Sequence, residues 1–425
     1  MARKMKDSGI EWIGEIPEGW EIAKLKNIAS IVRGGSPRPI EAYMSDNDND
    51  VNWIRISDTE KGSKYITHTS RKLIASGISK SRFIKRGSLI LTNSMSFGEP
   101  YILDIDGCIH DGWVAFSDFK KIDKEFLYYF LTSPLAKIQF EQQVDGGVVK
   151  NLNIDKIGDT VILLPSLIDQ NKIIAHLDSL TSETNSLLSK TITSIEEYKK
   201  LKQSVITQAV TKAIYDDFGN PSKFRKLRSL CDVLSKGTTP KDIETQNDEF
   251  YCIRYLKSEN IVSNQLNLNP TFFITAETNN SLERSKLNSG DILFVIAGAS
   301  IGKVAITTAD FLPANTNQAV AFIRLSSSYQ YATKYIWYFL QSDVVKQLIA
   351  LSAVQSAQPN LSLEDLGAMR LPLPDQMGCL KITDYLDAKC AEIDRLIAKK
   401  EQLVKELEGY KKNLIYEVVT GKREV

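Results

Sequence analysis

Histidine and cysteine are scarce in this chain, and the familiar catalytic and metal-binding motifs are absent. Three His and five Cys occur among 425 residues, and no two cysteines stand in CxxC spacing. Zinc sites and disulfide frameworks need clustered or paired Cys and His, so neither is expected. No HExxH motif occurs, and no acidic pair with a Lys indicates a nuclease core. We therefore expect no catalytic residues and no metal ligands, and hence a recognition or assembly protein.

Long apolar runs are also lacking. The longest, Val161–Ile168, is interrupted by Pro165 and Ser166 and cannot span a membrane. The opening residues, MARKMKDSGIEW, contain no apolar run typical of a signal peptide. With the unpaired cysteines, these features favour a cytoplasmic protein without a membrane partner.

The chain has no strong charge of one sign. Its formal net charge is +1, so a nucleic-acid partner would have to be met by local basic patches rather than by a global field. The hydrophobic fraction of 43% is enough for packed cores, and 425 residues favour two to four domains.

An internal repeat organises the chain. Leu177–Thr211 matches Leu386–Thr420 at an offset of 209, with ten of 35 positions identical, where chance gives roughly two. Neither copy contains Pro, and apolar residues recur at steps of three and four, so each is predicted to be one long helix of coiled-coil type. An ordinary amphipathic helix in a globular core is the alternative, but the duplication favours pairing of the two copies.

The repeat extends upstream of these helices. The offset of 209 holds without gaps from about residue 126, and it persists with small gaps nearer the N-terminus. The upstream matches used below are Ile54-Arg55 with Ile253-Arg254, Gly35-Ser36-Pro37 with Thr238-Thr239-Pro240, and Val114-Ala115-Phe116 with Val320-Ala321-Phe322.

The predicted fold class is α+β, with two similar globular domains separated by two long antiparallel helices that form a coiled-coil spacer. The duplication implies a pseudo-two-fold arrangement. Short β-rich runs alternate with turns in each globular part, and one helix follows, at Lys124–Gln142 and Tyr331–Leu351. The predicted domains are residues 1–165, a central helix 166–215, residues 216–374 and a C-terminal helix 375–425.

A stretch of the first globular part is basic. Lys61–Arg86 contains no acid, and aromatic residues are interleaved with its cations, as in surfaces that bind phosphates. A solvated basic face is the alternative. The DNA-binding candidates here are Lys61, Lys64, Arg71, Lys72, Arg82 and Lys85.

Two cationic, Gly-containing turns occupy matched places in the repeat. Arg33–Arg38 reads RGGSPR and Lys236–Lys241 reads KGTTPK, a composition that suits approach to phosphates, although purely structural turns would look the same. The candidates in these turns are Arg33, Ser36, Arg38, Lys236, Thr238, Thr239 and Lys241.

Other candidates lie near predicted strands. Arg55 and Arg254 suit guanine edges or local ion pairs, and Asn and Gln can read adenine, although Asn-rich turns are common. Lys303 lies in Gly298–Val304, which resembles a phosphate-binding loop but is one residue short and lacks the required Ser or Thr, so we interpret it as a strand-to-strand turn. The candidates here are Arg55, Arg254, His110, Asn315, Asn317, Gln318, Lys257 and Lys303.

The chain resembles a known family. The opening Asp7–Trp20, DSGIEWIGEIPEGW, is similar to the start of type I restriction–modification specificity (S) subunits, as are Gly35-Ser36-Pro37, the Leu-Pro-x-Pro at Leu371–Pro374 and the ends of both long helices. The duplicated layout is also that of the family. The second globular part lacks a clean copy of the Glu-Ile-Pro-Glu-Gly-Trp segment, so its start is approximate.

The resemblance implies a non-catalytic subunit that recognises double-stranded DNA with a bipartite target. Each globular part would be a target recognition domain reading one half, and the helices would fix the gap and dock two methyltransferase (M) subunits. Cofactors would be absent from this chain. S-adenosylmethionine would belong to the M subunits, and ATP and Mg²⁺ to motor-nuclease (R) subunits.

Two other functions are open. A single-chain restriction–methylation enzyme would need a methyltransferase tetrad and a nuclease core, and both are lacking. A coiled-coil protein-interaction adaptor without sequence-specific DNA binding would leave the acid-free basic stretch unexplained.

Overall fold

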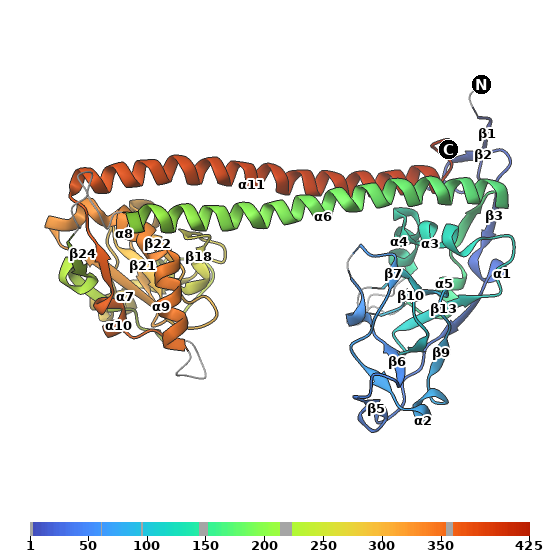
Figure 1. Ribbon diagram of the computed structural model, residues 1–425, viewed down its shortest axis with the longest axis horizontal. Coiled ribbons are helices and arrows are strands. Elements are labelled where there is room, and N and C mark those ends of the chain that lie inside the picture. Colours follow the sequence, from blue (N-terminus) through green and yellow to red (C-terminus); the bar gives the residue numbers. More distant parts are fainter. Residues whose placement is uncertain (1–2, 61, 95–96, 144–151, 213–222, 354–359) are drawn as a thin grey trace. The chain divides into compact units, whose positions relative to one another are not determined.

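The computed structural model describes residues 3–60, 62–94, 97–143, 152–212, 223–353 and 360–425. The chain divides into two compact units. Unit 1 comprises Met1–Ile192 and Gln402–Val425, and unit 2 comprises Thr193–Glu401. Each unit contains one globular part and a length of both long helices (Figure 1). No helix within the described residues is both long and apolar enough to cross a membrane.

The globular part of unit 1 is built on two mixed five-stranded sheets. Its short helices are α1 (Leu25–Ile28), η1 (Ile40–Tyr43), η2 (Ile56–Asp58), α2 (Ala75–Ile78), α3 (Lys124–Thr132), α4 (Pro134–Gln143) and α5 (Ile154–Gly158). Its strands are β1 (Met5–Asp7), β2 (Glu15–Pro17), β3 (Glu21–Lys24), β4 (Ser30–Arg33), β5 (Met44–Ser45), β6 (Val51–Ile54), β7 (Tyr65–Ile66), β8 (Lys72–Leu73), β9 (Arg82–Ile84), β10 (Leu89–Thr92), β11 (Pro100–Leu103), β12 (Gly107–Ile109), β13 (Trp113–Ser117) and β14 (Val161–Leu164).

The strands of each sheet are not arranged in sequence order, and the apolar strands are buried. One sheet runs β4-β13-β10-β11-β7 and the other β5-β8-β6-β12-β9. Strands β10 and β11 are buried throughout, because their residues are apolar on both faces. Strand β6 pairs with β12 in parallel, with Ile54 opposite Ile109. This parallel pair ends at the residues that form the candidate site.

Unit 2 repeats this plan with smaller sheets, of order β16-β24-β21-β22 and β20-β17-β23. Its strands are β15 (Phe224–Lys226), β16 (Cys231–Lys236), β17 (Tyr251–Leu256), β18 (Ile261–Val262), β19 (Gln265–Leu266), β20 (Phe273–Thr275), β21 (Ile292–Val295), β22 (Val304–Ile306), β23 (Ala314–Thr316), β24 (Val320–Leu325) and β25 (Arg370–Pro372). Its short helices are η3 (Leu227–Leu230), η4 (Ser258–Asn260), α7 (Ala276–Ser281), η5 (Glu283–Ser285), η6 (Ala309–Phe311), η7 (Ser327–Ala332), α8 (Thr333–Leu340), α9 (Asp343–Ala353) and α10 (Leu363–Ala368).

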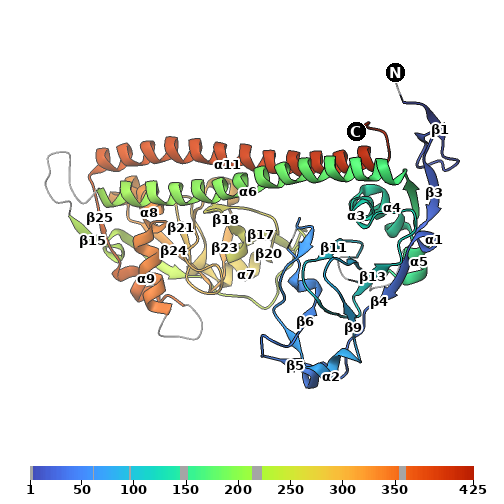
Figure 2. The same cartoon turned by 45° about the vertical axis from the view of Figure 1, so that its right-hand side comes forward.

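The two long helices are α6 (Leu167–Lys212) and α11 (Gln376–Val419), and their first residues are 209 positions apart. The predicted long helices are confirmed and begin ten residues earlier than the matched segments. They run antiparallel in each unit. In unit 1, Lys411 donates to Asn185 at 2.8 Å, and in unit 2 Lys202 donates to Asp394 at 2.7 Å. Figures 1 and 2 show the helices side by side.

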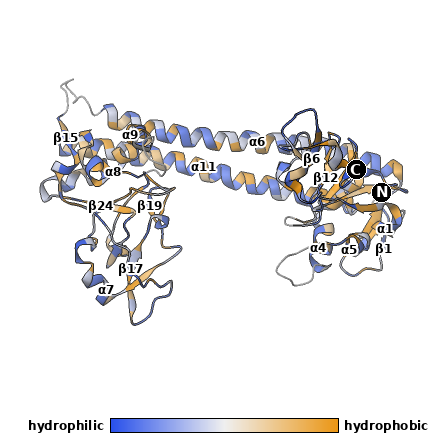
Figure 3. Ribbon diagram, turned by 90° about the horizontal axis from the view of Figure 1, so that it is seen from below, coloured by the Kyte–Doolittle hydropathy of each residue, from blue (hydrophilic) through white to orange (hydrophobic). Residues whose placement is uncertain are grey.

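Polar residues in the predicted helix seam are buried without loss of hydrogen bonding. Thr181, Thr184 and Thr191 of α6 are each less than a tenth exposed. Their hydroxyls donate to the carbonyl four residues earlier, at 2.6–2.7 Å. The polar seam is therefore tolerated because each hydroxyl is satisfied within its own helix. Figure 3 shows apolar segments gathered in the strands and alternating with polar ones along α6 and α11.

Two expectations for the globular parts are corrected. The helices predicted over Lys124–Gln142 and Tyr331–Leu351 are each broken into two, at Ser133 and near Ser342. Ser133 is extended because Pro134 follows it, and a residue before Pro avoids the helical region. The other correction concerns register. Leu91 pairs with Val114 and its equivalent Phe294 with Ala321, so Val114 corresponds to Ala321 and not to Val320.

Candidate nucleic-acid interface

A tight turn follows β4 in unit 1 and β16 in unit 2, and each turn approaches another loop closely. In unit 1, a Cβ on Gly34 would lie 2.0 Å from the carbonyl oxygen of His110. In unit 2, a Cβ on Gly237 would lie 1.8 Å from the carbonyl oxygen of Thr316. Only Gly permits either approach. The structural role that the sequence left open for these turns is thus present in both units.

In unit 1 the turn is tied to the loop that follows β12. Ser36 Oγ donates to Asp111 Oδ1 at 2.8 Å, and Arg33 Nε donates to the backbone oxygen of Asp111 at 2.9 Å. Arg38 Nη2 lies 3.5 Å from Asp111 Oδ2, and its side chain is 82% exposed. Partial burial opposes ionisation of Asp111, but the Ser36 bond and the neighbouring cations outweigh it, so its pKa lies below the ordinary value.

The same tie occurs in unit 2 with different side chains. The Thr239 hydroxyl donates to Gln318 Oε1, and Val320 N donates to the Asn317 oxygen as Trp113 N does to that of His110. Asn317 and Gln318 therefore correspond to His110 and Asp111. We define the polar corner of unit 1 as Gly34, Ser36, Arg38, His110 and Asp111, and the polar corner of unit 2 as Gly237, Thr239, Lys241, Asn317 and Gln318.

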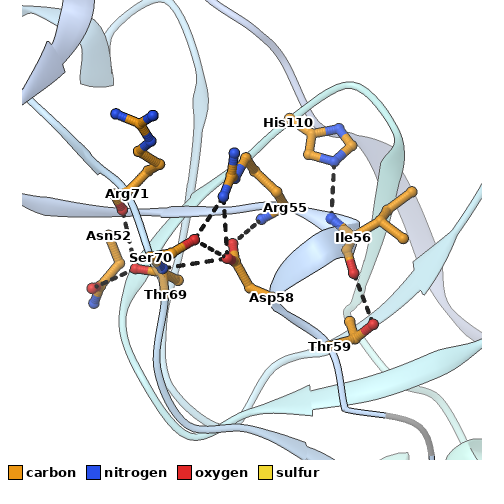
Figure 4. A network of polar contacts seen from close by, with 9 residues as sticks. All are labelled: Asn52, Arg55, Ile56, Asp58, Thr59, Thr69, Ser70, Arg71 and His110. Atoms are coloured by element: carbon orange, nitrogen blue, oxygen red, sulfur yellow. Dashed lines mark hydrogen bonds and ion pairs between the residues drawn. The ribbon is translucent and has the colours of Figure 1, made fainter. Parts of the chain in front are cut away.

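Arg55 lies beside the polar corner of unit 1 in a network of ion pairs and hydrogen bonds (Figure 4). Its Nη2 donates to Ser70 Oγ at 2.6 Å and lies 3.5 Å from Asp58 Oδ1. Its backbone N–H donates to the other Asp58 oxygen at 2.9 Å. Burial opposes ionisation of Asp58, whose side chain is 2% exposed, yet these hydrogen bonds and the Arg55 charge lower its pKa. The local ion pair left open by the sequence is therefore the observed arrangement.

The predicted equivalence of Arg55 and Arg254 is wrong. Ile54 pairs with Ile109, and the matching pair in unit 2 is Leu256 with Thr316, so Arg55 corresponds to Lys257. Lys257 starts η4 as Arg55 starts η2, with its N–H bonded to Asn260. Its Nζ lies 3.5 Å from the Phe272 ring centroid.

Arg254 has a different environment within β17. It donates to the backbone oxygen of Asp310 through Nη1. This carbonyl contact holds the guanidinium within unit 2. The small sequence gaps upstream of residue 126 produced the mismatch, because they hid a shift of three residues.

Both ring nitrogens of His110 face backbone N–H groups, and a neutral imidazole can accept from only one of them. Its Nδ1 lies 2.7 Å from the N–H of Gly112 and its Nε2 lies 3.3 Å from that of Ile56. The ring also packs beside Trp53 and Trp113. Burial, with Arg55 nearby, lowers its pKa against the opposing charge of Asp111. His110 is therefore a neutral, structural part of the corner at neutral pH, and its ring edges face the protein.

A hollow of about 920 Å³ opens beside the polar corner of unit 1. Its floor includes the buried Trp53, and its walls carry Arg55 and the turn that begins at Ser36. An apolar floor with a cationic wall suits a ligand that presents both flat faces and negative charge. The lining residues are Ser36, Pro37, Arg38, Pro39, Ile40, Glu41, Trp53, Arg55, Ile56, Ser57 and His110.

The basic stretch divides into structural and exposed cations. Lys64 contacts Glu125 and Asp178, the latter at 2.6 Å, and is only 15% exposed. Its predicted role in DNA binding is not supported, because both partners belong to its own unit. Lys72 donates to Asn52 at 2.8 Å. Arg71, Arg82 and Lys85 are exposed, and Lys61 lies outside the described residues.

The remaining candidates of unit 2 also divide. Asn315 lies in β23, fully buried, and its amide donates to Asn279 and to the Leu282 oxygen, so it cannot face a ligand in this structure. Lys303 is exposed in the turn between β21 and β22, as the strand-to-strand interpretation of that loop predicts. Lys236, Thr238 and Lys241 are exposed, and Thr238 also accepts from Tyr255 through its backbone oxygen.

The residue that the candidate set omitted is Asp111. An acid does not suggest DNA binding, and the only sequence signal for Asp111 is its position next to His110 before an apolar strand. The structure makes it the centre of the unit 1 corner.

Comparison with known proteins agrees with this duplicated layout. A family model described as "Type I restriction modification DNA specificity domain" matches residues 17–197 and again residues 220–406. The chain belongs to this family. The two matched segments reproduce the internal repeat. Their last residues are separated by the offset of 209, but their first residues are not, because of the small sequence gaps upstream of residue 126.

Individual relatives carry the same label. The chain is 24% identical to the EcoBI specificity subunit of Escherichia coli over 93% of this chain and 85% of the relative. It is 23% identical to the MjaVIII specificity subunit of Methanocaldococcus jannaschii over 96% and 93%. Both are type I restriction enzyme subunits.

Two solved structures share the fold. One is a chain from a study of complex assembly and conformational transition of the type I R-M system, with TM-score 0.73 and 16% identity over 96% of this chain and 99% of that one. The other is the HsdS subunit of Thermoanaerobacter tengcongensis, with TM-score 0.50 and 17% identity over 96% and 98%. The predicted α+β class and duplicated domains are confirmed.

Proposed function

We propose that this chain is the non-catalytic DNA-specificity subunit of a type I restriction–modification complex, in which each unit reads one half of a bipartite DNA target. The observation that carries the proposal is the duplicated polar corner. Two copies of one scaffold present exposed cations together with different polar side chains, Asp111 in one and Gln318 in the other. Cations suit phosphates and the polar side chains suit base edges, so two such corners can read two different short sequences.

The long helices supply the second element of the proposal. Large apolar side chains are about half exposed on α6, at Leu187, Ile192 and Leu201, and on α11, at Met377, Leu380 and Tyr385. Exposed apolar residues in such number mark protein interaction sites. We assign these faces to the docking of two methyltransferase subunits, with the helix length fixing the gap between half-sites. S-adenosylmethionine would be held by those subunits, and ATP with Mg²⁺ by motor-nuclease subunits.

The test is to coexpress the chain with a methyltransferase partner in a methylation-free host and to map methylated adenines by single-molecule sequencing. The proposal predicts a split motif with a fixed gap that disappears when this chain is omitted. Methylation that is independent of the chain, or methylation of a continuous motif, would refute it.

The adaptor function predicts something different. An adaptor would assemble with partners without conferring a DNA sequence preference. Binding to DNA through phosphate contacts must weaken steeply as salt rises, because counterions are released on binding. Complexes that assemble normally but show neither DNA preference nor salt-dependent DNA affinity would favour the adaptor.

A further inference from the structure

The two polar corners differ most informatively at one structurally equivalent position. Asp111 and Gln318 both follow the parallel strand pair by two residues, and both accept a hydroxyl hydrogen bond from the Gly-containing turn. The backbone around them is also similar, since Gly34 and Gly237 each lie against the carbonyl oxygens of the last strand residue and of the residue after it. The backbone scaffold is therefore similar in both units, while the side chain that it carries is a carboxylate in unit 1 and an amide in unit 2.

The hydroxyl tether leaves part of each tip available. In unit 1, Ser36 holds one oxygen of Asp111, whose side chain is 43% exposed. In unit 2, Thr239 holds the oxygen of Gln318, and that residue is exposed. Asp111 thus keeps acceptor sites on Oδ2, which lies 3.5 Å from the exposed Arg38 Nη2, and Gln318 presents an amide nitrogen. The tether fixes the direction of both groups, as base recognition requires.

The flanking charges suit a carboxylate that meets DNA. Arg33 and Arg38 lie on either side of Asp111, and both are exposed. Lys236 and Lys241 occupy the matching sequence positions in the turn of unit 2, and both are exposed. These cations suit phosphates on both sides of the tip, so a single carboxylate can approach a base without meeting uncompensated backbone charge.

We propose that Asp111 and Gln318 are specificity-determining residues that each read a base edge in a different half of the target. An ionised carboxylate only accepts hydrogen bonds, so Asp111 takes the exocyclic amine of cytosine. The amide of Gln318 donates through its nitrogen and can still accept on the second lone pair of its Thr239-bound oxygen, so it pairs with adenine. This inference rests on the proposed function and adds the residue and base class in each unit.

The test uses isosteric substitutions in the intact complex with its methyltransferase partner. Asp111→Asn keeps the Ser36 tether and adds two donors, and Gln318→Glu keeps the Thr239 tether and removes the donors. Binding is measured against duplexes that carry one substituted base pair at each position of the mapped target. Matched controls are Asp159→Asn, which removes a surface carboxylate between α5 and β14, and Gln330→Glu, an exposed residue in η7.

The expected result is a change at one position only. Asp111→Asn should lower discrimination by about tenfold to a hundredfold at a single cytosine of one half-site, and Gln318→Glu should do so at an adenine of the other. The controls should keep the wild-type ranking of duplexes. Should Asp111→Asn fail to fold, Ser36→Ala removes the hydroxyl that holds Asp111 and should weaken discrimination at the same position.

The failing outcomes are distinct. If wild-type complex has no bipartite target, the proposed function fails and this inference fails with it. If wild-type complex reads a bipartite target but both variants keep its full ranking, only this inference is overturned. Changes by both variants within the same half-site would also overturn it, because the two residues lie in different units.

Discussion

The two units use one scaffold but hold it together with different charges. In unit 1, Asp178 of α6 binds the globular part: it accepts a hydrogen bond from the Tyr129 hydroxyl and forms an ion pair with Lys64. In unit 2, Asp387 of α11 makes the matching contacts: it accepts a hydrogen bond from the Tyr338 hydroxyl at 2.8 Å and forms an ion pair with Lys334. The Tyr and Asp are equivalent, but the cation comes from the region of β7 in unit 1 and from α8 in unit 2.

This difference shows which features the duplication has preserved. The position of Lys334 in unit 2 is occupied by Glu125 in unit 1, and Lys64 bridges Glu125 and Asp178. The hydrogen-bonded pair of Tyr and Asp is kept, whereas its cationic partner has moved. The polar corners show the same pattern. Both keep the Gly of the turn and the hydroxyl hydrogen bond, but the accepting side chain is Asp111 in unit 1 and Gln318 in unit 2. Scaffold contacts are thus shared, and charged surfaces diverge.

The largest expected effect is on the free energy of unfolding and tests the Gly-containing turn that both units share. Gly34→Ala and Gly237→Ala should each destabilise the protein by about 3 kcal/mol, because the new methyl group would meet a backbone carbonyl that cannot rotate away. The measurement is the free energy of unfolding in guanidinium chloride. Gly409→Ala in α11 is the control, since its Cβ meets no atom within 4 Å, and it should stabilise by up to about 1 kcal/mol. A neutral result at either turn would contradict the close approach.

The next effect should separate the units. Lys64→Met should cost roughly 2 kcal/mol, because Lys64 is 15% exposed and its loss leaves Glu125 and Asp178 facing each other. Lys334→Met should cost less than about 1 kcal/mol, because that side chain is half exposed. Both variants are compared with wild type by denaturant unfolding. Equal losses in the two variants would show that the charge rearrangement has no energetic consequence.

The smallest effect concerns pH and exists in one unit only. Burial beside Trp53 and Trp113 lowers the pKa of His110, with Arg55 adding to this and Asp111 and Asp58 opposing it. The unfolded chain therefore binds the proton first as pH falls, so the stability from neutral His110 is present above about pH 6.5 and is lost below it. Unit 2 has Asn317 at this position, which does not titrate.

The variant His110→Asn copies unit 2 into unit 1 and provides the measurement. Unfolding free energies of wild type and variant are compared at pH 7.5 and pH 5.5. The wild type should lose more stability than the variant on acidification, by an amount smaller than either preceding effect. His68 and His176 are present in both proteins and cancel in the difference. An identical loss in both proteins would mean that His110 is not held neutral.

Much of the fold could be predicted because the repeat is gapless where the chain is helical. One offset related the two long helices, and the structure keeps that offset between the first residues of α6 and α11. Three Thr residues of the predicted seam, Thr181, Thr184 and Thr191, are buried, because a polar Thr in a helix can bond to its own backbone. Long helices with a periodic apolar pattern can be predicted from the sequence alone.

The candidate site could be predicted only in part. The Gly-containing turns were found because their composition is local. The pairing of Arg55 with Arg254 was wrong because equivalence there depends on sheet register, which small gaps conceal. The contact of Lys64 with Asp178, 114 residues away, and the burial of Asn315 in a strand could not be predicted from the local sequence. Contacts between distant segments decide which polar residues remain exposed.

The central claim is that the two units read separate halves of the target. The most direct measurement replaces residues 216–374 with the equivalent segment of a relative of known, different target and maps methylated adenines produced with the methyltransferase partner. The account predicts that one half of the motif changes, while the other half and the gap stay as in wild type. A change in both halves, or an unchanged motif, would contradict it.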